Sequence, residues 1–345
     1  MAENIMINSL VPPTWNRLKV NEAFVELPEK INMISQDEGV VPADDAGADA
    51  WNIETGCGDE LSAYLNAQGI KPLTAAANSE ELFVVKPAFT ADSAQVLCFD
   101  ATEGKTLNIL TDLSSGDDVQ GTGVFRILIR ARENSVVNLT QILRPGKGLR
   151  LINDIGTQVS DKAKVNLVQV FTGGSDIYAG YRSELSGEDA FADCRIGLVR
   201  GENETLDMNY VMKHLAPRSK SEINVSGALS NGAKKTFRGT IDFVRGCAGA
   251  EGAENESILI LDDTVINKTV PLILCTEENV AGSHGASIGK PAEEMLYYMM
   301  SRGIDRKRAL EILERASLTA AAAHIENADA LEYVMNIIDE NREDD

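Results

Sequence analysis

Short segments with alternating apolar residues recur from about residue 80 to residue 289, and this pattern limits the possible folds more than any other feature of the sequence. Alternation with a period of two is typical of β-strands with one buried face. The clearest segments contain Val137 and Leu139; Val165 and Leu167; Leu206, Met208, Tyr210 and Met212; Ile223 and Val225; and Ile241 and Phe243. They predict a mainly β fold.

The spacing of these segments narrows the choice of β fold. Breaks such as Gly173-Gly174 and Asn231-Gly232 separate several strands at intervals of about 12 to 16 residues. Such spacing is compatible with a sandwich or with a solenoid. Roughly 180 residues of short strands without helical stretches between them favour a stacked β-helix, in which each coil buries its inner face against its neighbours.

After Gly289 the apolar period becomes that of helices. We expect one helix to start with Pro291 at its first position and to run to Gly303. A second should begin after the cap residue Asp305, and a third after Asp329 or Asn327. Near the N-terminus, residues 59–68 predict a short helix that ends at Gly69.

These patterns divide the chain into three expected domains. We expect a mixed and partly helical N-terminal region at 1–75, a β-helix core at 76–289, and a C-terminal α-helical domain at 290–345. The acidic end of the chain, from Asp339 to Asp345, is expected to be a solvated tail.

Composition limits the partners and the compartment. Lys and Arg number 32 against 53 Asp and Glu, and the resulting charge of −21 disfavours a nucleic-acid partner. The first residues lack the pattern of a secretory signal, and no stretch approaches the roughly 20 apolar residues of a membrane span. Five cysteines without a CxxC pair indicate free thiols rather than a disulfide framework. We therefore expect a cytoplasmic protein without a membrane partner.

Several sequence blocks occur in the order typical of one known family. They are His214 to Ser221, Val225 to Leu229, the Phe237-Arg238-Gly239 strand, a Gly249 to Asn255 turn, and the Gly282-Ser283-His284-Gly285-Ala286-Ser287-Ile288-Gly289 block that leads to Ser301-Arg302-Gly303. With these blocks, the tract from about 204 to 318 resembles the SufB/SufD family of iron–sulfur cluster assembly scaffolds.

The resemblance implies a right-handed parallel β-helix with a C-terminal helical domain, which agrees with the strand and helix patterns. It further implies a scaffold without enzymatic activity of its own, which builds and transfers a nascent cluster together with a SufC-type ATPase. The ATPase should bind the C-terminal helices, and the partner-binding residues that we expect are Leu296, Tyr297, Met300, Arg302 and Leu310. A second SufB/SufD-type subunit, or a second copy of this chain, should pair through the β-helix.

The sequence lacks a phosphate-binding motif, which agrees with an ATPase on a separate chain. A phosphate-binding loop needs the pattern GxxxxGK[ST] after a strand. The nearest stretch, Gly104-Lys105-Thr106, has Phe99 where the first glycine should be. We therefore expect ATP hydrolysis in a partner subunit.

The resemblance also implies that His284 is a ligand of a transient iron–sulfur cluster at a subunit interface; imidazole is an ordinary iron ligand. The rest of the family's ligand set is not matched. SufB proteins have a cysteine in the strand that here reads Glu256 to Ile260, and SufD proteins often have one where this chain has Gly282. Cys275 and Cys247 lie nearby in sequence and are candidate thiolate ligands.

Two other functions stay open. β-Helices also carry carbohydrate-active enzymes, which need clustered carboxylates, whereas the pairs Asp262-Asp263 and Glu277-Glu278 would point to opposite faces of a strand. The chain is alternatively a structural, SufD-like subunit without cluster ligands, with His284 packed in the core. The sequence does not decide between a homodimer and a heterodimer, and it gives neither the cluster type nor a signature for flavin binding.

Overall fold

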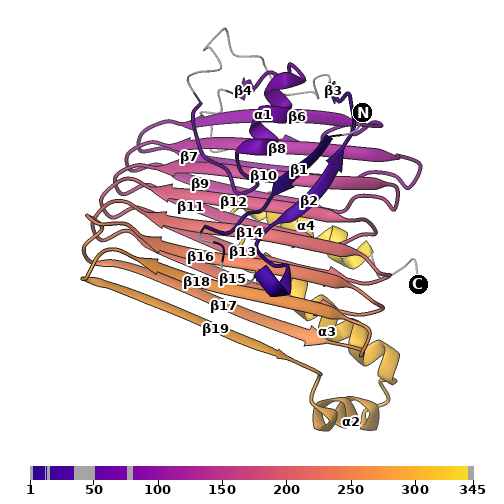
Figure 1. The fold of residues 1–345 in the computed structure, drawn as a ribbon. Coiled ribbons are helices and arrows are strands. Elements are labelled where there is room, and N and C mark those ends of the chain that lie inside the picture. The colour runs from indigo at the N-terminus through magenta and orange to yellow at the C-terminus, as the bar shows by residue number, and fades with distance from the viewer. Residues whose placement is uncertain (1–2, 12, 14–15, 35–50, 76–80, 341–345) are drawn as a thin grey trace.

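A computed structural model describes residues 3–11, 13, 16–34, 51–75 and 81–340. Of the predicted acidic tail, Asp339 and Glu340 are instead the last residues of a helix, and residues 341–345 lie outside the described residues. Two parallel sheets form the core, and the chain passes from one sheet to the other once per strand (Figure 1). The prediction of a parallel β-helix followed by helices is confirmed.

The first sheet contains the following strands in spatial order: β18 (Ile266–Cys275), β16 (Lys234–Phe243), β14 (Thr205–His214), β12 (Ile177–Leu185), β10 (Leu149–Val159), β8 (Gly121–Ala131), β6 (Ser93–Ala101) and β3 (Asn32–Met33), with β4 (Leu73–Ala75) also paired to β6. The order in the second sheet is β19 (Val280–Gly289), β17 (Ala250–Ile260), β15 (Lys220–Leu229), β13 (Phe191–Arg200), β11 (Lys164–Phe171), β9 (Val136–Leu143), β7 (Thr106–Asp112) and β5 (Leu82–Val85).

Side chains of the same kind stack between coils. Val137 is in register with Val165, and Leu139 with Leu167, so the inward residues of neighbouring strands lie directly above one another. These four side chains are fully or almost fully buried. Because the period of two directs alternate residues inward in every strand, the apolar pattern of the sequence corresponds to the interior of the solenoid.

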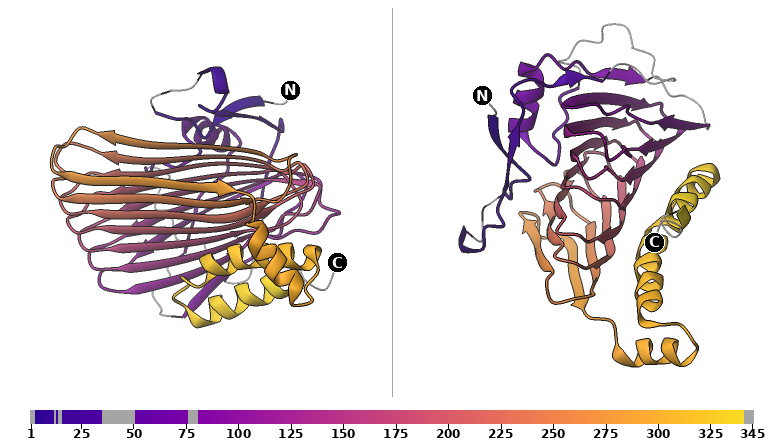
Figure 2. Two further views of the ribbon diagram at one scale, coloured as in Figure 1. Left: turned by 90° about the horizontal axis from the view of Figure 1, so that it is seen from below. Right: turned by 90° about the vertical axis from the view of Figure 1, so that its right-hand side faces the viewer.

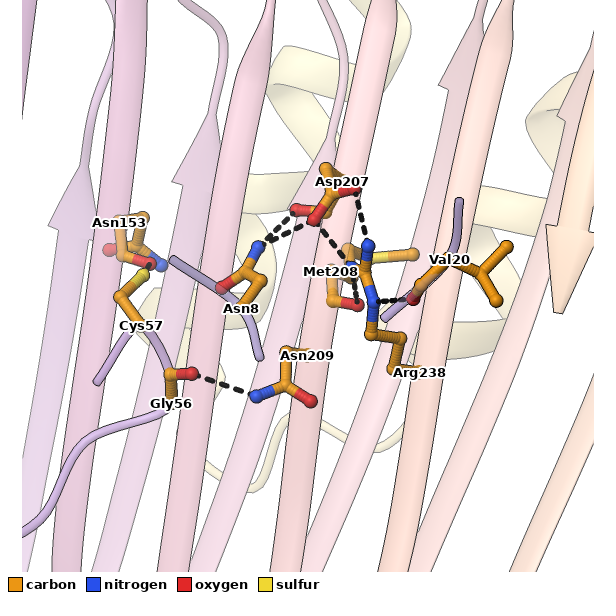
Figure 3. Close-up of polar contacts among 9 residues, drawn as sticks. All are labelled: Asn8, Val20, Gly56, Cys57, Asn153, Asp207, Met208, Asn209 and Arg238. Carbon is orange, nitrogen blue, oxygen red and sulfur yellow. Dashed lines mark hydrogen bonds and ion pairs between the residues drawn. The ribbon is translucent and has the colours of Figure 1, made fainter. Parts of the chain in front are cut away.

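The N-terminal residues cover the outer face of the first sheet. An antiparallel hairpin of β1 (Glu3–Ile7) and β2 (Ala23–Leu27) is followed by helix α1 (Asp59–Ala67), which begins at the predicted residue. A single 3-10 turn, η1 (Asn16–Leu18), precedes β2. Figure 3 shows how this segment is held to the sheet: the amide of Asn8 donates to Asp207 Oδ1 at 2.8 Å, and Asn209 donates to the carbonyl of Gly56 at 2.8 Å.

Three helices end the described chain: α2 (Glu293–Ser301), α3 (Arg306–Ala322) and α4 (Ala328–Glu340). Asp305 caps α3 as predicted, by accepting a hydrogen bond from Arg308 N at 2.8 Å. Of the two predicted caps of the third helix, Asn327 takes the role and accepts from Ala330 N at 3.0 Å. The predicted start of the first helix is wrong, because α2 begins at Glu293 and not at Pro291.

Helices α3 and α4 lie along the outer face of the second sheet, whereas α2 projects past its end (Figure 2). The buried helix residues Leu318, Ala321, Ala322, Val334 and Ile338 form one apolar cluster with the outward-facing strand residues Leu110, Ile142, Val168 and Val170. This cluster joins the helices to the β-helix. The domain boundaries at 75/76 and 289/290 stay a prediction.

Candidate functional site at the open end of the β-helix

The last coil of the β-helix, formed by β18 and β19, has strand neighbours on one side only within the described chain. Its inward apolar side chains are consequently exposed: Ile273 is 36% and Ile288 45% accessible, whereas the corresponding residues one coil earlier, Ile241 and Ile258, are buried. The interior of the solenoid is therefore open at this end.

His284 lies on the inward face of β19. A methyl group added at Gly282, two residues earlier, would contact the side chains of Phe243 and Ile273 in the interior, so the even-numbered residues of this strand point inward. His284 is exposed because no further coil covers it within the described residues. Its neighbour in register on β17 is Glu254.

Glu254 is a buried carboxylate, only 2% accessible, and its Oε2 has no hydrogen-bond partner among the described residues. Gly239, on the opposite sheet, leaves room for this side chain, because a methyl group there would lie 2.5 Å from Oε2. Burial, and secondarily the charge of Glu256, raise the pKa of Glu254 to about 7, while Lys235 opposes the shift.

Lys235 and Glu256 form a fully buried ion pair next to Glu254. Lys235 Nζ also donates to Asn267 Oδ1 at 2.9 Å, and the hydroxyl of Thr269 donates to Glu256 Oε2 at 2.7 Å. Burial lowers the pKa of Lys235 from its ordinary value. A buried pair of this kind is stable only when hydrogen bonds satisfy both partners, and Asn267 and Thr269 supply them.

The two candidate cysteines lie at one corner of the last coils. Cys275 is exposed at the end of β18, and its thiol donates to the carbonyl of Glu277 at 2.9 Å. Cys247 is buried in the turn after β16, where burial raises the pKa of its thiol. His284 lies further along β19, four residues after Val280 at the start of that strand. Four residues span about 13 Å in a strand.

The structure thus places the three predicted ligand residues near the same end of the β-helix, but it does not gather them at one point. No group of three or more His, Cys, Asp or Glu side chains is placed to hold a metal ion in the described part of the chain. The contribution of each residue to a cluster stays a prediction.

The sequence prediction does not identify Glu254, Lys235 and Glu256 as residues of this end of the β-helix. The predicted turn from Gly249 to Asn255 is wrong, because Ala250–Ile260 form strand β17. Because side chains alternate in a strand, Glu254 and Glu256 lie on the same inward face of β17 as Ala250, Gly252 and Ile258. Two carboxylates on an otherwise small and apolar face are a sequence signal that could have identified them.

The predicted partner-binding residues lie on or beside α2. Tyr297 is 75% accessible, Met300 and Arg302 are also exposed, and the Arg302 guanidinium lies 5.3 Å from the centre of the Tyr298 ring. Leu310 of α3 is half-buried, and Leu296 is only 1% accessible. An exposed aromatic and methionine surface on a projecting helix is typical of a protein contact site. In the described residues, no helix is long and apolar enough to span a membrane.

The fold and the open end define a class: parallel β-helix proteins with buried charged groups inside a terminal coil. Within that class, residues 89–317 match the family model described as the SufBD core domain of the SUF system for iron–sulfur cluster assembly. This match covers well over half of the sequence. The chain belongs to the SufBD family of iron–sulfur cluster assembly proteins.

Individual relatives align over shorter stretches. An iron–sulfur cluster assembly protein SufB of Bacillus subtilis is 33% identical over 129 residues, which are 37% of this chain and 28% of that protein. A SufBD family protein of Mycobacterium bovis is 27% identical over 148 residues, which are 43% of this chain and 18% of that protein. The alignments therefore span less than a third of the length of these relatives.

Proposed function

We propose that this chain is a scaffold subunit of SUF-type machinery, on which a nascent iron–sulfur cluster is built and from which it is transferred, in the cytoplasm. Membership of the SufBD family supports a role in iron–sulfur cluster assembly. The observation that supports the site is His284, which stands exposed at the open end of the β-helix beside the buried Glu254. The cluster is the cargo of such a protein and not a resident cofactor.

His284 is proposed as a ligand of the cargo cluster, with Cys275 or Cys247 as a thiolate ligand. Imidazole and thiolate are both ordinary ligands of iron in clusters. Of the two thiols, Cys275 is the accessible one, whereas Cys247 would have to become exposed before it could bind. A site with few ligands from one chain suits transfer, because fewer bonds must be broken to release the cluster.

A SufC-type ATPase is proposed to dock on α2. The exposed side chains Tyr297 and Met300 would contact it, with Arg302 at the edge of the surface. Because Leu296 is buried, we assign it to the support of this helix rather than to the contact surface. The half-buried Leu310 of α3 is proposed as a further contact of the ATPase.

A second SufB/SufD-type subunit, or a second copy of this chain, is proposed to pair with the last coil. Strands β18 and β19 each have an edge without a neighbour in the described chain, and such edges are ready to pair with another chain. Pairing here would also cover Ile273 and Ile288 and enclose His284 between the subunits.

The proposed role of His284 is tested by His284→Ala in the full chain, purified with its ATPase and second subunit and reconstituted anaerobically. We expect the iron and sulfide content of the complex, and cluster transfer to an acceptor, to fall at least tenfold. His324→Ala is the matched control, since His324 is also exposed but lies at the end of α3. Parental cluster content and transfer in His284→Ala would refute the role.

The structural, SufD-like alternative has one supporting observation, the absence of a cysteine from residues 256–260 of β17. It predicts parental assembly in the His284→Ala complex. The carboxylate pairs that a carbohydrate-active enzyme would need serve turns instead: Asp262 accepts the amides of Asn231 and Thr264, and Glu277 accepts that of Gly246 at 2.9 Å.

A further inference from the structure

The edge strand β18 is held from the outside of the β-helix. Of its residues, all of which the structure describes, only Val270 is buried. The neighbouring Thr269 points inward, where its hydroxyl donates to Glu256, so Val270 points to the outer face of the first sheet. The other strand of the last coil, β19, is also described in full and has no buried residue. The two strands of the open end therefore differ in what covers them.

The N-terminal segment covers Val270. Residues 8–11 and 16–21, which we call the N-terminal strap, run along the outer face of the last strands of the first sheet. Leu10 and Val20 of this strap are almost completely buried, and they form one apolar cluster with Val270. One of the first segments of the chain thus packs against the last strand of the first sheet.

Arg238 attaches the strap to β16, the strand next to β18. Its side chain is only 1% accessible, although it lies on the outer face beside Val270 in the register of β16 and β18. Its Nε donates to the carbonyl of Val20 at 2.5 Å, and its terminal nitrogens donate to Asp207 at 2.6 and 3.1 Å (Figure 3). The amide of Asn8 donates to the same carboxylate at 2.8 Å. Arg238 belongs to one of the recognised sequence blocks, and the proposed cluster site gives it no role.

We propose that the N-terminal strap is a conformational latch that keeps the edge strand β18 in place. A strand with one neighbour opens more easily than a strand between two neighbours, since opening it breaks a single ladder of hydrogen bonds. With the strap bound, opening β18 also exposes the apolar cluster of Leu10, Val20 and Val270 to water. With the strap released, β18 frays, while the earlier coils stay folded because they have neighbours on both sides.

The latch rests on the proposed function in one respect, the pairing of a second subunit with the last coil. A bound strap presents an ordered edge of β18 to that subunit, and a released strap presents a frayed one. The latch therefore makes the pairing depend on a segment that lies outside the coils of the β-helix.

The test is hydrogen–deuterium exchange of the full chain, measured by mass spectrometry of its peptides. We expect exchange at residues 266–275 to become at least tenfold faster in Leu10→Ala, and exchange at residues 164–171, in the middle of the second sheet, to stay unchanged. Asn8→Ala breaks the polar attachment instead and should give the same localised change. Leu18→Ala is the matched control, because Leu18 belongs to the strap but its side chain is largely exposed.

Parental exchange of β18 in Leu10→Ala would overturn the latch. Equal acceleration in Leu18→Ala, or at residues 164–171, would also overturn it, because the strap would then stabilise the whole fold and not the edge. In sedimentation velocity with the second subunit, Leu10→Ala should weaken association at least tenfold, and parental association despite faster exchange would refute the link to pairing. If the parental chain itself does not associate, the proposed pairing falls, and the exchange of the chain alone still decides the latch.

Discussion

At the scale of single residues, the ammonium group of Lys235 is fully buried and held by an ion pair. Replacing it with methionine would leave Glu256 buried without its cation, and removing one partner of a buried pair destabilises a protein by about 3–5 kcal/mol. We expect a loss of this size for Lys235→Met in urea unfolding. Lys220→Met is the control: its pair with Glu251 is exposed and should contribute less than about 1 kcal/mol. Equal losses in both variants would contradict the account.

His214 should make the stability of the fold depend on pH. Its Nδ1 and Nε2 lie 2.8 Å from the hydroxyls of Ser219 and Ser221, and Ser219 donates its own proton to the carbonyl of Ala216. Nδ1 therefore carries a proton and donates it to Ser219, and in the neutral ring Nε2 accepts from Ser221. Burial lowers the pKa of His214 to about 4.

The direction of this pH dependence follows from proton uptake by the folded and the unfolded chain. An unfolded chain protonates this histidine below about pH 6.5, whereas the folded chain does so only near pH 4, so stability is lost as the pH falls between these values. The full effect is about 3 kcal/mol. We expect His214→Gln to remove this part of the slope in chemical denaturation measured from pH 7.5 to pH 4.5. An unchanged slope would show that His214 is not buried as a neutral ring.

The sequence predicted the inward apolar residues but not the charged ones at this scale. Period two directs Leu206 and Tyr210 inward, and both are buried. The same rule applies to Lys235 and Glu256, but each is common on surfaces, and their pairing depends on which strands of opposite sheets face each other. The pairing of Lys235 with Glu256 depends on how the coils stack, and the sequence of a single strand does not indicate it.

At the scale of elements, the contact of α3 with the second sheet depends on Gly197 of β13. A methyl group at Gly197 would lie 3.0 Å from Leu318 Cα and 3.1 Å from Ala321 Cβ, so a larger side chain must push the helix away. We expect Gly197→Leu to lower the free energy of unfolding by about 1–3 kcal/mol. Gly289→Ala is the control, because its added methyl group meets no atom within 4 Å. No difference between the two variants would contradict this packing.

The helices could be predicted because caps and periodicity are local signals. Asp305 and Asn327 cap their helices, because the side-chain oxygen of each accepts a hydrogen bond from the backbone N–H three residues later. The corners of the β-helix give a weaker signal. Asn134, Lys162 and Asp189 adopt positive φ at successive coils; Asn and Asp favour this conformation, whereas Lys does not. Stacking of the coils therefore contributes to these corners in addition to local preference.

At the scale of the whole molecule, the open last coil predicts association. We expect the full chain to form a dimer, or a heterodimer with its second subunit, through β18 and β19. Ile288→Lys, which places a charge on the inward face of the edge strand, should weaken this association at least tenfold in sedimentation velocity experiments. Phe24→Lys, at another exposed apolar residue, which lies in the N-terminal hairpin, is the control and should leave the association unchanged. A chain that stays monomeric at high concentration with its partners present would contradict the pairing.

The fold class and the family were predictable because both are distributed over the chain, as a strand period and as ordered blocks between residues 204 and 318. The site was predictable only in part. His284 belongs to a recognisable block, but its neighbour Glu254 is 30 residues away in sequence and is brought beside it by one full coil of the β-helix. A coil-long separation carries no local sequence signal.

The central claim is that the nascent cluster is held at the open end of the β-helix by His284. The most direct measurement is pulsed EPR of the reduced, anaerobically reconstituted complex, with this chain labelled with ¹⁵N-histidine. The account predicts a histidine nitrogen coupled to the cluster, whose isotope signature disappears in His284→Ala and persists in His324→Ala. A cluster without histidine coupling in the parental complex, or with unchanged coupling in His284→Ala, would contradict it.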